Sequence, residues 1–274
     1  MSTIAKAMEL LNFFSLDRPE IGLSDFHRLA GRDKATTFRH LTALESVGLL
    51  EQNPATRAYR IGPAVLRLAH LREVTLPRRA GVRMVLPRLA EITGETAHAS
   101  ILDATGLTTL AHHENKSHSA RVVLHESSLP LHATASGIAV LAYGGAALMD
   151  HALDQMQVYT DSTMRSRDEV TAAADTARKI GFSIANQSYE AGVTGIGTPL
   201  FDSNGIAGSV AVAAVSSRLT PELQHTIKQE LRRAARIISQ HWGGSIPPAL
   251  ENAWTTHLGP DNACAPADQT EKAS

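Results

Sequence analysis

The sequence has one cysteine, few aromatic residues and no long apolar run among its 274 residues. Cys264 cannot form a disulfide within the chain, which favours a location in the reducing cytoplasm. No apolar run approaches the roughly 20 residues that a membrane-spanning helix needs. The N-terminal residues MSTIAKAMELLNFF lack the basic start and the cleavage site of a signal peptide. We therefore expect a cytoplasmic protein without a membrane partner.

The sequence also lacks the motifs of common catalytic and metal sites. It has no HExxH helix, no CxxC pair and no GxSxG nucleophile elbow, and GVTGIG lacks the lysine of a phosphate-binding loop. Its 13 histidines still leave open an alternative function, a metal-binding or hydrolytic domain fused to an interaction module. The clustered histidines are His98, His112, His113, His118, His125 and His132. Adjacent residues 112 and 113 on a strand would point to opposite faces, so we expect no catalytic residue, metal or cofactor.

The formal charge of −1 conceals an uneven distribution along the chain. Residues 1–80 hold 12 Lys and Arg against 8 Asp and Glu, giving +4, whereas the other residues hold 14 against 19, giving −5. The length and the hydrophobic content of 43% are sufficient for two packed domains. A basic N-terminal domain followed by an acidic C-terminal region is typical of a DNA-binding domain joined to a domain with another function. An ordinary solvent-exposed charged surface would give the same modest excess of positive charge.

The stretch DKATTFRHLTALESVGLL, residues 33–50, predicts an amphipathic helix at the centre of the N-terminal domain. Asp33 can cap its start, and Gly48 fits the position after its end. The predicted buried side comprises Phe38, Leu41, Leu44 and Glu45. The predicted exposed side comprises Thr36, Arg39, His40 and Ala43. Threonine and arginine near a helix start are side chains that can contact phosphates and base edges.

The surrounding segments predict a winged helix-turn-helix domain over residues 1–62. A first helix over 4–14 closes the core, and a short helix over 24–30 with Ser24 as N-cap leads to a turn at Gly31. The segment EQNPATRAYRIG then predicts a β-hairpin wing with Arg57 near its tip. This order of elements indicates a mostly α-helical domain that binds double-stranded DNA.

Residues 63–93 predict two linker helices, which Pro77 separates. The first carries an apolar stripe of Val65, Leu68 and Leu71, which would be exposed beside a polar domain. We expect this stripe to pair with its copy in a homodimer, which would present two reading heads to a pseudo-palindromic operator.

Residues 94–243 predict an α+β domain with an antiparallel sheet. Hairpins are expected around residues 103–106 and 202–205, a further strand over 121–126, and helices after Thr134 and over 166–180 and 219–242. Residues 244–274, which are rich in Pro, Gly and small polar residues, predict a disordered tail.

Six segments of the chain follow one another in a characteristic order over residues 3–242. They are GLSDFHRLAGRDKATTFRHLTALESVGLL, YRIGPAVLRLA, LPLHATASGIAVLA, GFSIANQSYEAG, GIGTPLFDSNGIAGSVAVA and SSRLT. In these segments the chain resembles the isocitrate lyase regulator (IclR) family of transcriptional regulators. The resemblance implies a winged-helix DNA-binding domain, a linker helix and a GAF-like effector-binding domain. It also implies dimers or tetramers that control catabolic operons.

The resemblance places the recognition helix on residues 34–44. Its implied DNA contacts are Lys34, Thr36, Thr37, Arg39 and His40, together with Arg57 on the wing. Helical periodicity independently predicts that three of these residues, at positions 36, 39 and 40, are exposed. Lys34 and Thr37 lie nearer the predicted buried side, from which the first helical turn can still reach phosphate.

The resemblance also implies an effector pocket between a helix start and neighbouring strands. The residues at this pocket are Ala135, Ser136, Gly137, Asn186, Thr194, Gly195, Ala211 and Ala213. Backbone N–H groups at the helix start favour an anion, and small carboxylates or aromatic acids are usual for the family. The chain departs from the family pattern at Gln187, Ser188, Gly195, Ala211, Ala213 and Ile138. This loss of polar anchors favours a larger or more apolar acid, although the same small residues also suit a closely packed sheet.

Overall fold

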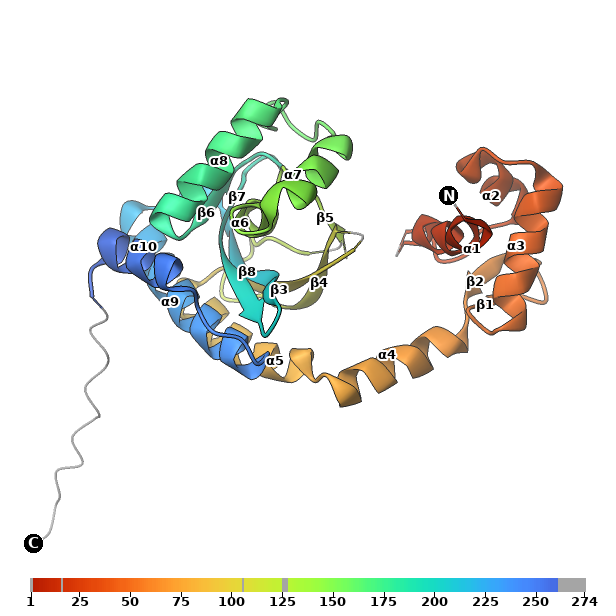
Figure 1. Ribbon diagram of the computed structural model, residues 1–274, viewed down its shortest axis with the longest axis horizontal. Coiled ribbons are helices and arrows are strands. Elements are labelled where there is room, and N and C mark those ends of the chain that lie inside the picture. The colour runs from red at the N-terminus through yellow and green to blue at the C-terminus, as the bar shows by residue number, and fades with distance from the viewer. Residues whose placement is uncertain (1, 16, 105, 125–127, 261–274) are drawn as a thin grey trace, which may run out of the picture. The chain divides into compact units, whose positions relative to one another are not determined.

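Figure 1 shows the computed structural model, which describes residues 2–15, 17–104, 106–124 and 128–260. The chain divides into two compact units, Met1–Pro77 and Arg78–Ser274. No helix within the described ranges is both long and apolar enough to cross a membrane.

The N-terminal unit is a winged helix-turn-helix, as the sequence predicts. Its elements are α1 (Thr3–Met8), η1 (Glu9–Phe13), α2 (Leu23–Ala30), α3 (Lys34–Ser46), β1 (Leu50–Gln52), β2 (Tyr59–Ile61) and α4 (Pro63–Thr75). Strands β1 and β2 pair antiparallel as the wing, and Leu50 lies opposite Ile61. Phe26 of α2 is fully buried and makes edge contacts with the rings of Phe13, Phe14 and Tyr59. This aromatic cluster fixes how α2 packs beneath the wing.

Local capping signals predicted the ends of α3 correctly. The Asp33 carboxylate accepts a hydrogen bond of 2.8 Å from the Thr36 N–H, and these contacts lower the pKa of Asp33. Gly48 follows the helix with a φ of 74°, which glycine adopts without steric cost. The predicted N-cap of α2 is wrong, because α2 begins at Leu23 and Gly22 occupies the cap position without a side-chain hydrogen bond.

The C-terminal unit is an α+β domain around an antiparallel sheet. Its strands are β3 (Thr96–Asp103), β4 (Gly106–His113), β5 (Ser128–Leu129), β6 (Ser183–Asn186), β7 (Val193–Asp202) and β8 (Gly205–Val215). They lie in the order β5-β4-β3-β8-β7-β6, and every neighbouring pair is antiparallel. The expected hairpin turns at residues 103–106 and 202–205 are confirmed.

Helices cover the two faces of this sheet with residues of different size. The first face packs its larger side chains, such as Ile196 and Val212, against α5 (Arg78–Thr93) and α9 (Pro221–His241). The second face carries small residues where it meets α6 (Ala135–Leu141). Figure 1 shows α6 with α7 (Gly145–Asp154) and α8 (Arg167–Ile180), away from α5 and α9.

Three expectations for this unit need correction. Residues 121–124 form no strand, and the Val122 carbonyl oxygen accepts its hydrogen bond from the Thr96 side chain; residues 125 and 126 lie outside the described ranges. The second linker helix, α5, belongs to the core of this unit through Val82, Leu86 and Leu89. The third correction concerns the predicted tail.

The expected disorder is wrong for α10 (Pro248–Leu258), which packs against the unit. Leu250 and Trp254 are fully buried, and the Trp254 indole N–H donates a 2.9 Å hydrogen bond to the Gly181 carbonyl oxygen. The Pro- and Gly-rich composition of residues 244–274 hid the apolar spacing within this helix. Residues 261–274 lie outside the described ranges.

Candidate functional site

The exposed face of α3 is turned around the helix axis relative to the sequence prediction. Its buried side comprises Thr37, His40, Leu41 and Leu44. Phe38, which was expected inside, is 48% exposed, whereas His40, which was expected outside, is 7% exposed. Thr37 is spaced four and seven residues before Leu41 and Leu44 and completes their buried stripe, and its hydroxyl donates a 3.0 Å hydrogen bond to the Asp33 carbonyl oxygen. The prediction is therefore wrong for the orientation of Phe38 and His40.

The other expected DNA contacts lie at the surface. Lys34 and Arg39 are exposed on α3, which corrects the expectation that Lys34 would lie near the buried side. Thr36 is half-buried, and its hydroxyl accepts a 3.0 Å hydrogen bond from the Arg39 guanidinium. Arg57 is exposed in the wing turn, where its φ is 60° and its N–H donates to the Asn53 carbonyl oxygen. Thr37 is 1% exposed and His40 is 7% exposed, so their side chains cannot present a surface to DNA.

The C-terminal unit contains a cavity of about 190 Å³ beside the start of α6. Strands β3, β6, β7 and β8, together with residues 122–124, contribute its walls. Its lining residues are His98, Val122, Val123, Leu124, Leu129, Ala133, Thr134, Ala135, Ser136, Ala185, Tyr189, Glu190, Val193, Gly195 and Ala213. A largely apolar cavity with a few polar groups is typical of a small-molecule site.

Half of the residues expected at the effector pocket line this cavity. They are Ala135, Ser136, Gly195 and Ala213. Gly137, Asn186, Thr194 and Ala211 are absent from its described lining. For two of the latter four, Asn186 and Thr194, the absence follows directly from strand pairing.

Thr194 pairs in register with Asn186, and the Thr194 hydroxyl donates a 3.0 Å hydrogen bond to the Asn186 side chain. Because side chains alternate along a strand, Thr194 points away from the face that Gly195 supplies. Ala211 is fully buried opposite His98 in the β3–β8 pairing. The period of the strands thus places Asn186 and Thr194 on the other face of the sheet, which corrects the expectation for these two residues. Ala211 shares the face of His98 and Ala213 but is absent from the described lining.

Gly137 is excluded from the lining by the packing of α6. A Cβ atom there would lie 2.3 Å from the Leu131 carbonyl oxygen. Its N–H donates a 3.0 Å hydrogen bond to the Thr134 hydroxyl, which caps the helix. Of the three N–H groups at residues 135–137 that the sequence offered to an anion, the one on Gly137 is therefore used within the protein.

The small residues of β7 allow α6 to approach the sheet closely. A Cβ atom at Gly195 would lie 3.0 Å from the Ala135 Cβ, and one at Gly197 would lie 3.1 Å from the Ser183 Oγ. Side chains at these two positions would push α6 away and displace its first residues from the cavity wall. The alternative of a closely packed sheet is thus correct here, and the close packing is also what forms the cavity.

His98 is the principal polar residue that sequence reasoning missed at the cavity. Its side chain is 6% exposed, and its Nε2 lies 3.0 Å from the Ser136 Oγ. Its Nδ1 has no hydrogen-bond partner among the described residues. Burial, with a smaller contribution from His112, lowers the pKa of His98 to about 4, so the imidazole is neutral near pH 7. His98 and Ser100 lie two residues apart and share one face of β3, and this spacing was the signal that could have grouped them.

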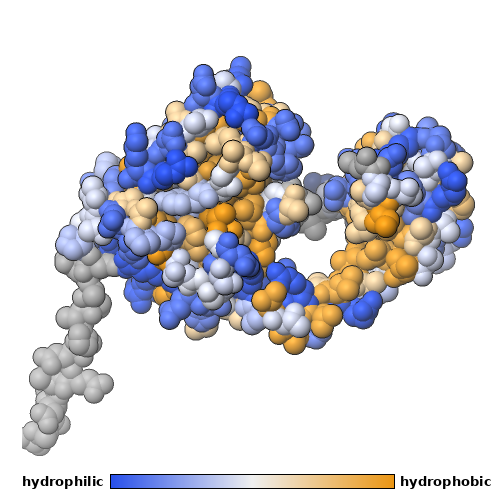
Figure 2. All heavy atoms as spheres, viewed as in Figure 1, coloured by the Kyte–Doolittle hydropathy of each residue, from blue (hydrophilic) through white to orange (hydrophobic). Residues whose placement is uncertain are grey.

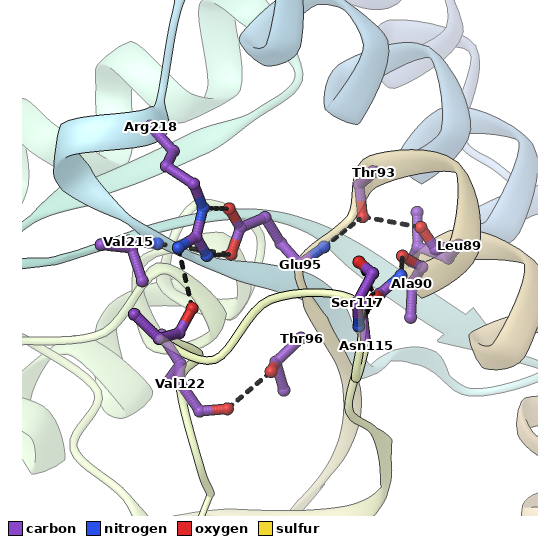
Figure 3. Close-up of polar contacts among 11 residues, drawn as sticks. Leu89, Ala90, Thr93, Glu95, Thr96, Asn115, Ser117, Val122, Val215 and Arg218 are labelled. Atoms are coloured by element: carbon purple, nitrogen blue, oxygen red, sulfur yellow. Dashed lines mark hydrogen bonds and ion pairs between the residues drawn. The ribbon is translucent and has the colours of Figure 1, made fainter.

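Side-chain hydrogen bonds hold the wall formed by residues 122–124 (Figure 3). Arg218 binds both carboxylate oxygens of Glu95 at 2.8 Å and also donates to the Ala120 carbonyl oxygen. The Thr96 hydroxyl donates a 2.6 Å hydrogen bond to the Val122 carbonyl oxygen. The ion pair raises the pKa of Arg218, because Glu95 stabilises the charged guanidinium. This part of the cavity depends on contacts between residues far apart in the sequence.

The clustered histidines do not form a metal centre within the described residues. No group of three or more His, Cys, Asp or Glu side chains there is arranged to hold a metal ion. His98 instead contacts a serine, and His132 contacts the Gln157 carbonyl oxygen at 2.8 Å. His125 lies outside the described ranges.

Comparisons with known proteins match both units. A family model described as the IclR helix-turn-helix domain matches residues 3–54, and one described as the bacterial transcriptional regulator IclR C-terminal domain matches residues 71–240. A crystal structure of an ICLR transcriptional regulator from Silicibacter sp. TM1040 is 38% identical, covers 90% of this chain and 99% of its own, and has a TM-score of 0.85.

Two further relatives carry informative names. The glycerol operon regulatory protein of Streptomyces coelicolor is 27% identical, and the match covers 89% of this chain and 97% of that protein. The crystal structure of an IclR homolog complexed with 4-hydroxybenzoate, from Microbacterium hydrocarbonoxydans, is 21% identical with a TM-score of 0.70. That match covers 88% of this chain and 99% of the other, and at this identity it shows the fold alone.

Replacing Arg218 with Ala is expected to loosen the cavity wall. It leaves the Glu95 carboxylate, whose side chain is 2% exposed, without its cation, so the loss should exceed the roughly 0–1 kcal/mol of an exposed pair. Urea denaturation measures the free energy of unfolding, and hydrogen exchange measures amide protection near residues 120–123. Arg167→Ala is the control, because Arg167 and Asp150 form a pair with both side chains 60% exposed. Equal effects of the two substitutions would contradict this role of Arg218.

Proposed function

Since the chain belongs to the IclR family and is a DNA-binding, ligand-responsive transcriptional regulator, we propose which of its surfaces bind operator and effector. The exposed face of α3 and the wing bind an operator in double-stranded DNA, and the cavity beside α6 binds a small organic effector. The observation that carries this proposal is that one unit exposes Lys34 and Arg39 on α3 and the other contains a largely apolar cavity.

The regulated genes are proposed to form a catabolic operon. The name of the Streptomyces glycerol operon regulator supports this class of target. An organic or aromatic acid was expected from the resemblance, and the 4-hydroxybenzoate complex of a structural relative supports a ligand the size of one aromatic ring. The relatives are named as regulators, which gives no support to the enzyme alternative. The cytoplasmic location expected from the lone cysteine stays a prediction.

The proposed DNA contacts differ in part from those expected from sequence. Lys34, Thr36, Arg39 and Arg57 are retained, because each reaches the surface of the N-terminal unit. Thr37 and His40 are withdrawn, because both are buried. Phe38 is added, because its exposed ring lies on the face of α3 that also carries Arg39.

We propose that α4 joins two copies of the chain. None of its residues is buried, and Leu66, Leu68 and Leu71 are 76%, 47% and 54% exposed. Figure 2 shows apolar residues following this helix. Burying this apolar surface in a homodimer would favour association at about 25 cal/mol per Å², before the entropy of association is subtracted. Further pairing of dimers into tetramers is compatible with the same proposal.

Arg39→Ala is expected to weaken binding to the operator. Loss of a bidentate base contact costs roughly 1–3 kcal/mol, or about 5- to 150-fold in affinity. The probe is a duplex selected by the parent protein from a random library, and a gel-shift titration gives the affinity. Arg167→Ala, in the C-terminal unit, is the control. Unchanged operator affinity of Arg39→Ala would contradict the assignment of the recognition helix.

Phe38 is expected to contact the methyl group of a thymine. Apolar contact with this methyl distinguishes thymine from other bases in the major groove. Replacing thymine with uracil in the selected duplex should therefore lower the affinity of the parent protein for the duplex. The affinity of Phe38→Ala should stay unchanged. An equal loss of affinity in both proteins would show that the methyl groups act elsewhere.

The proposed dimer predicts that Leu68→Glu combined with Leu71→Glu yields a monomer. Two carboxylates in an apolar interface would have to be desolvated without partners. Light scattering at micromolar concentration measures the mass, and His70→Glu on the opposite side of α4 is the control. A monomeric parent protein would contradict the proposal directly.

A further inference from the structure

The described lining of the cavity contains no lysine or arginine. Its groups that can carry charge near neutral pH are His98, which burial keeps neutral, and the exposed carboxylate of Glu190. A carboxylate ligand would therefore leave water without meeting a cationic side chain in this lining. Burial of an unpaired charge is strongly unfavourable, whereas a neutral ligand avoids this penalty.

The start of α6 compensates an anion only weakly. This helix has seven residues, and the N–H of Gly137 already donates to the Thr134 hydroxyl. The remaining walls are mostly aliphatic, with Val122, Leu124 and Leu129 among them. The described lining therefore offers an organic acid no cationic side chain, which departs from the ligand class expected from the family resemblance.

His98 lines this apolar cavity and carries a buried hydrogen-bonding atom without a partner among the described residues. The ring is 6% exposed, its Nε2 is engaged with the Ser136 hydroxyl, and its Nδ1 has no partner among the described residues. A buried polar atom of this kind destabilises the protein until a ligand or water satisfies it. His98 therefore favours a ligand with a polar group that can reach Nδ1.

A hydroxyl group matches this requirement better than a carboxylate. If Nε2 donates to Ser136, Nδ1 is an acceptor; if Ser136 donates to Nε2, Nδ1 carries the proton and is a donor. A hydroxyl can both donate and accept, so it satisfies either tautomer. An ionised carboxylate can only accept, so it satisfies one tautomer and adds an unpaired charge.

We propose that the pocket recognises an uncharged, largely apolar compound through a hydroxyl group, with His98 and its partner Ser136 as the polar anchor. The proposal rests on the proposed function of this cavity as the effector site. An apolar cavity of about 150 Å³ can hold benzene, so the cavity of about 190 Å³ fits one aromatic ring with a short substituent. The ligand class is thus a small aromatic or similarly sized alicyclic alcohol.

The test compares three probes that share one ring: benzyl alcohol, benzoate and benzyl fluoride. Calorimetric titration of the full-length protein at neutral pH measures each affinity. Benzyl alcohol should bind roughly tenfold or more tightly than either of the others, because benzoate would bury an unpaired charge and the fluoride is a poor hydrogen-bonding partner for either tautomer of His98. Tighter binding of benzoate, or equal binding of the alcohol and the fluoride, would overturn the proposal.

Variants of His98 assign the preference to this residue. His98→Phe keeps a ring of similar shape but no hydrogen-bonding atom, so the affinity for the alcohol should no longer exceed the affinity for the fluoride. His98→Gln retains a donor and an acceptor and should restore part of the preference, which also covers the case in which His98→Phe does not fold. His113→Phe, at the exposed end of β4, is the control and should behave like the parent. A preference that persists in both His98 variants would overturn the proposal.

The outcomes also separate this proposal from the proposed effector function. Binding of benzoate that changes operator affinity would overturn the hydroxyl anchor and leave the effector function standing. If none of the three probes binds, the hydroxyl anchor is overturned for ring-sized ligands. The effector function fails only if no compound in a wider panel of organic molecules alters operator affinity.

Discussion

The close approach of α6 to β7 is the constraint on which the C-terminal unit depends. It requires Gly195 and Gly197, because a Cβ atom at either position would meet Ala135 or Ser183 at about 3 Å. The opposite face of the same strand carries Ile196 and Leu200 into the core beneath α5 and α9. One strand thus alternates between a surface that fills the core and a surface that brings a helix start to the cavity wall.

Sequence reasoning succeeded where the physical cause was local. Asp33 caps α3 through a residue three positions away, and the turn at residues 202–205 joins adjacent strands. It failed where the cause was distant: α3 turns Thr37 rather than Phe38 toward the core of its unit, and the wall at residues 122–124 depends on the pairing of Glu95 with Arg218. The cavity was located in outline because small residues and a helix start occur there. His98 was missed because its spacing from Ser100 indicates a shared face of β3 and not which face meets the cavity.

The division of the chain between two units sets the energetic requirement for regulation. The effector can alter operator binding only if it prefers one of the DNA-binding arrangements of the protein over another. A tenfold change in operator affinity corresponds to about 1.4 kcal/mol of such preference. One or two well-satisfied hydrogen bonds in an apolar cavity supply free energy of this size, so the cavity does not need a strong ion pair to act as a switch.

The most direct test of the central claim is to fill the cavity and measure the response of operator affinity to a ligand. Ala213 lines the cavity and pairs with Gly195 across the sheet, so Ala213→Leu places a larger side chain inside it. The ligand is the compound, from a panel of small aromatic alcohols and acids, that changes operator affinity of the parent protein most. The account predicts that Ala213→Leu binds the operator like the parent and no longer responds to this compound. A full response in a folded Ala213→Leu protein would show that the effector binds elsewhere.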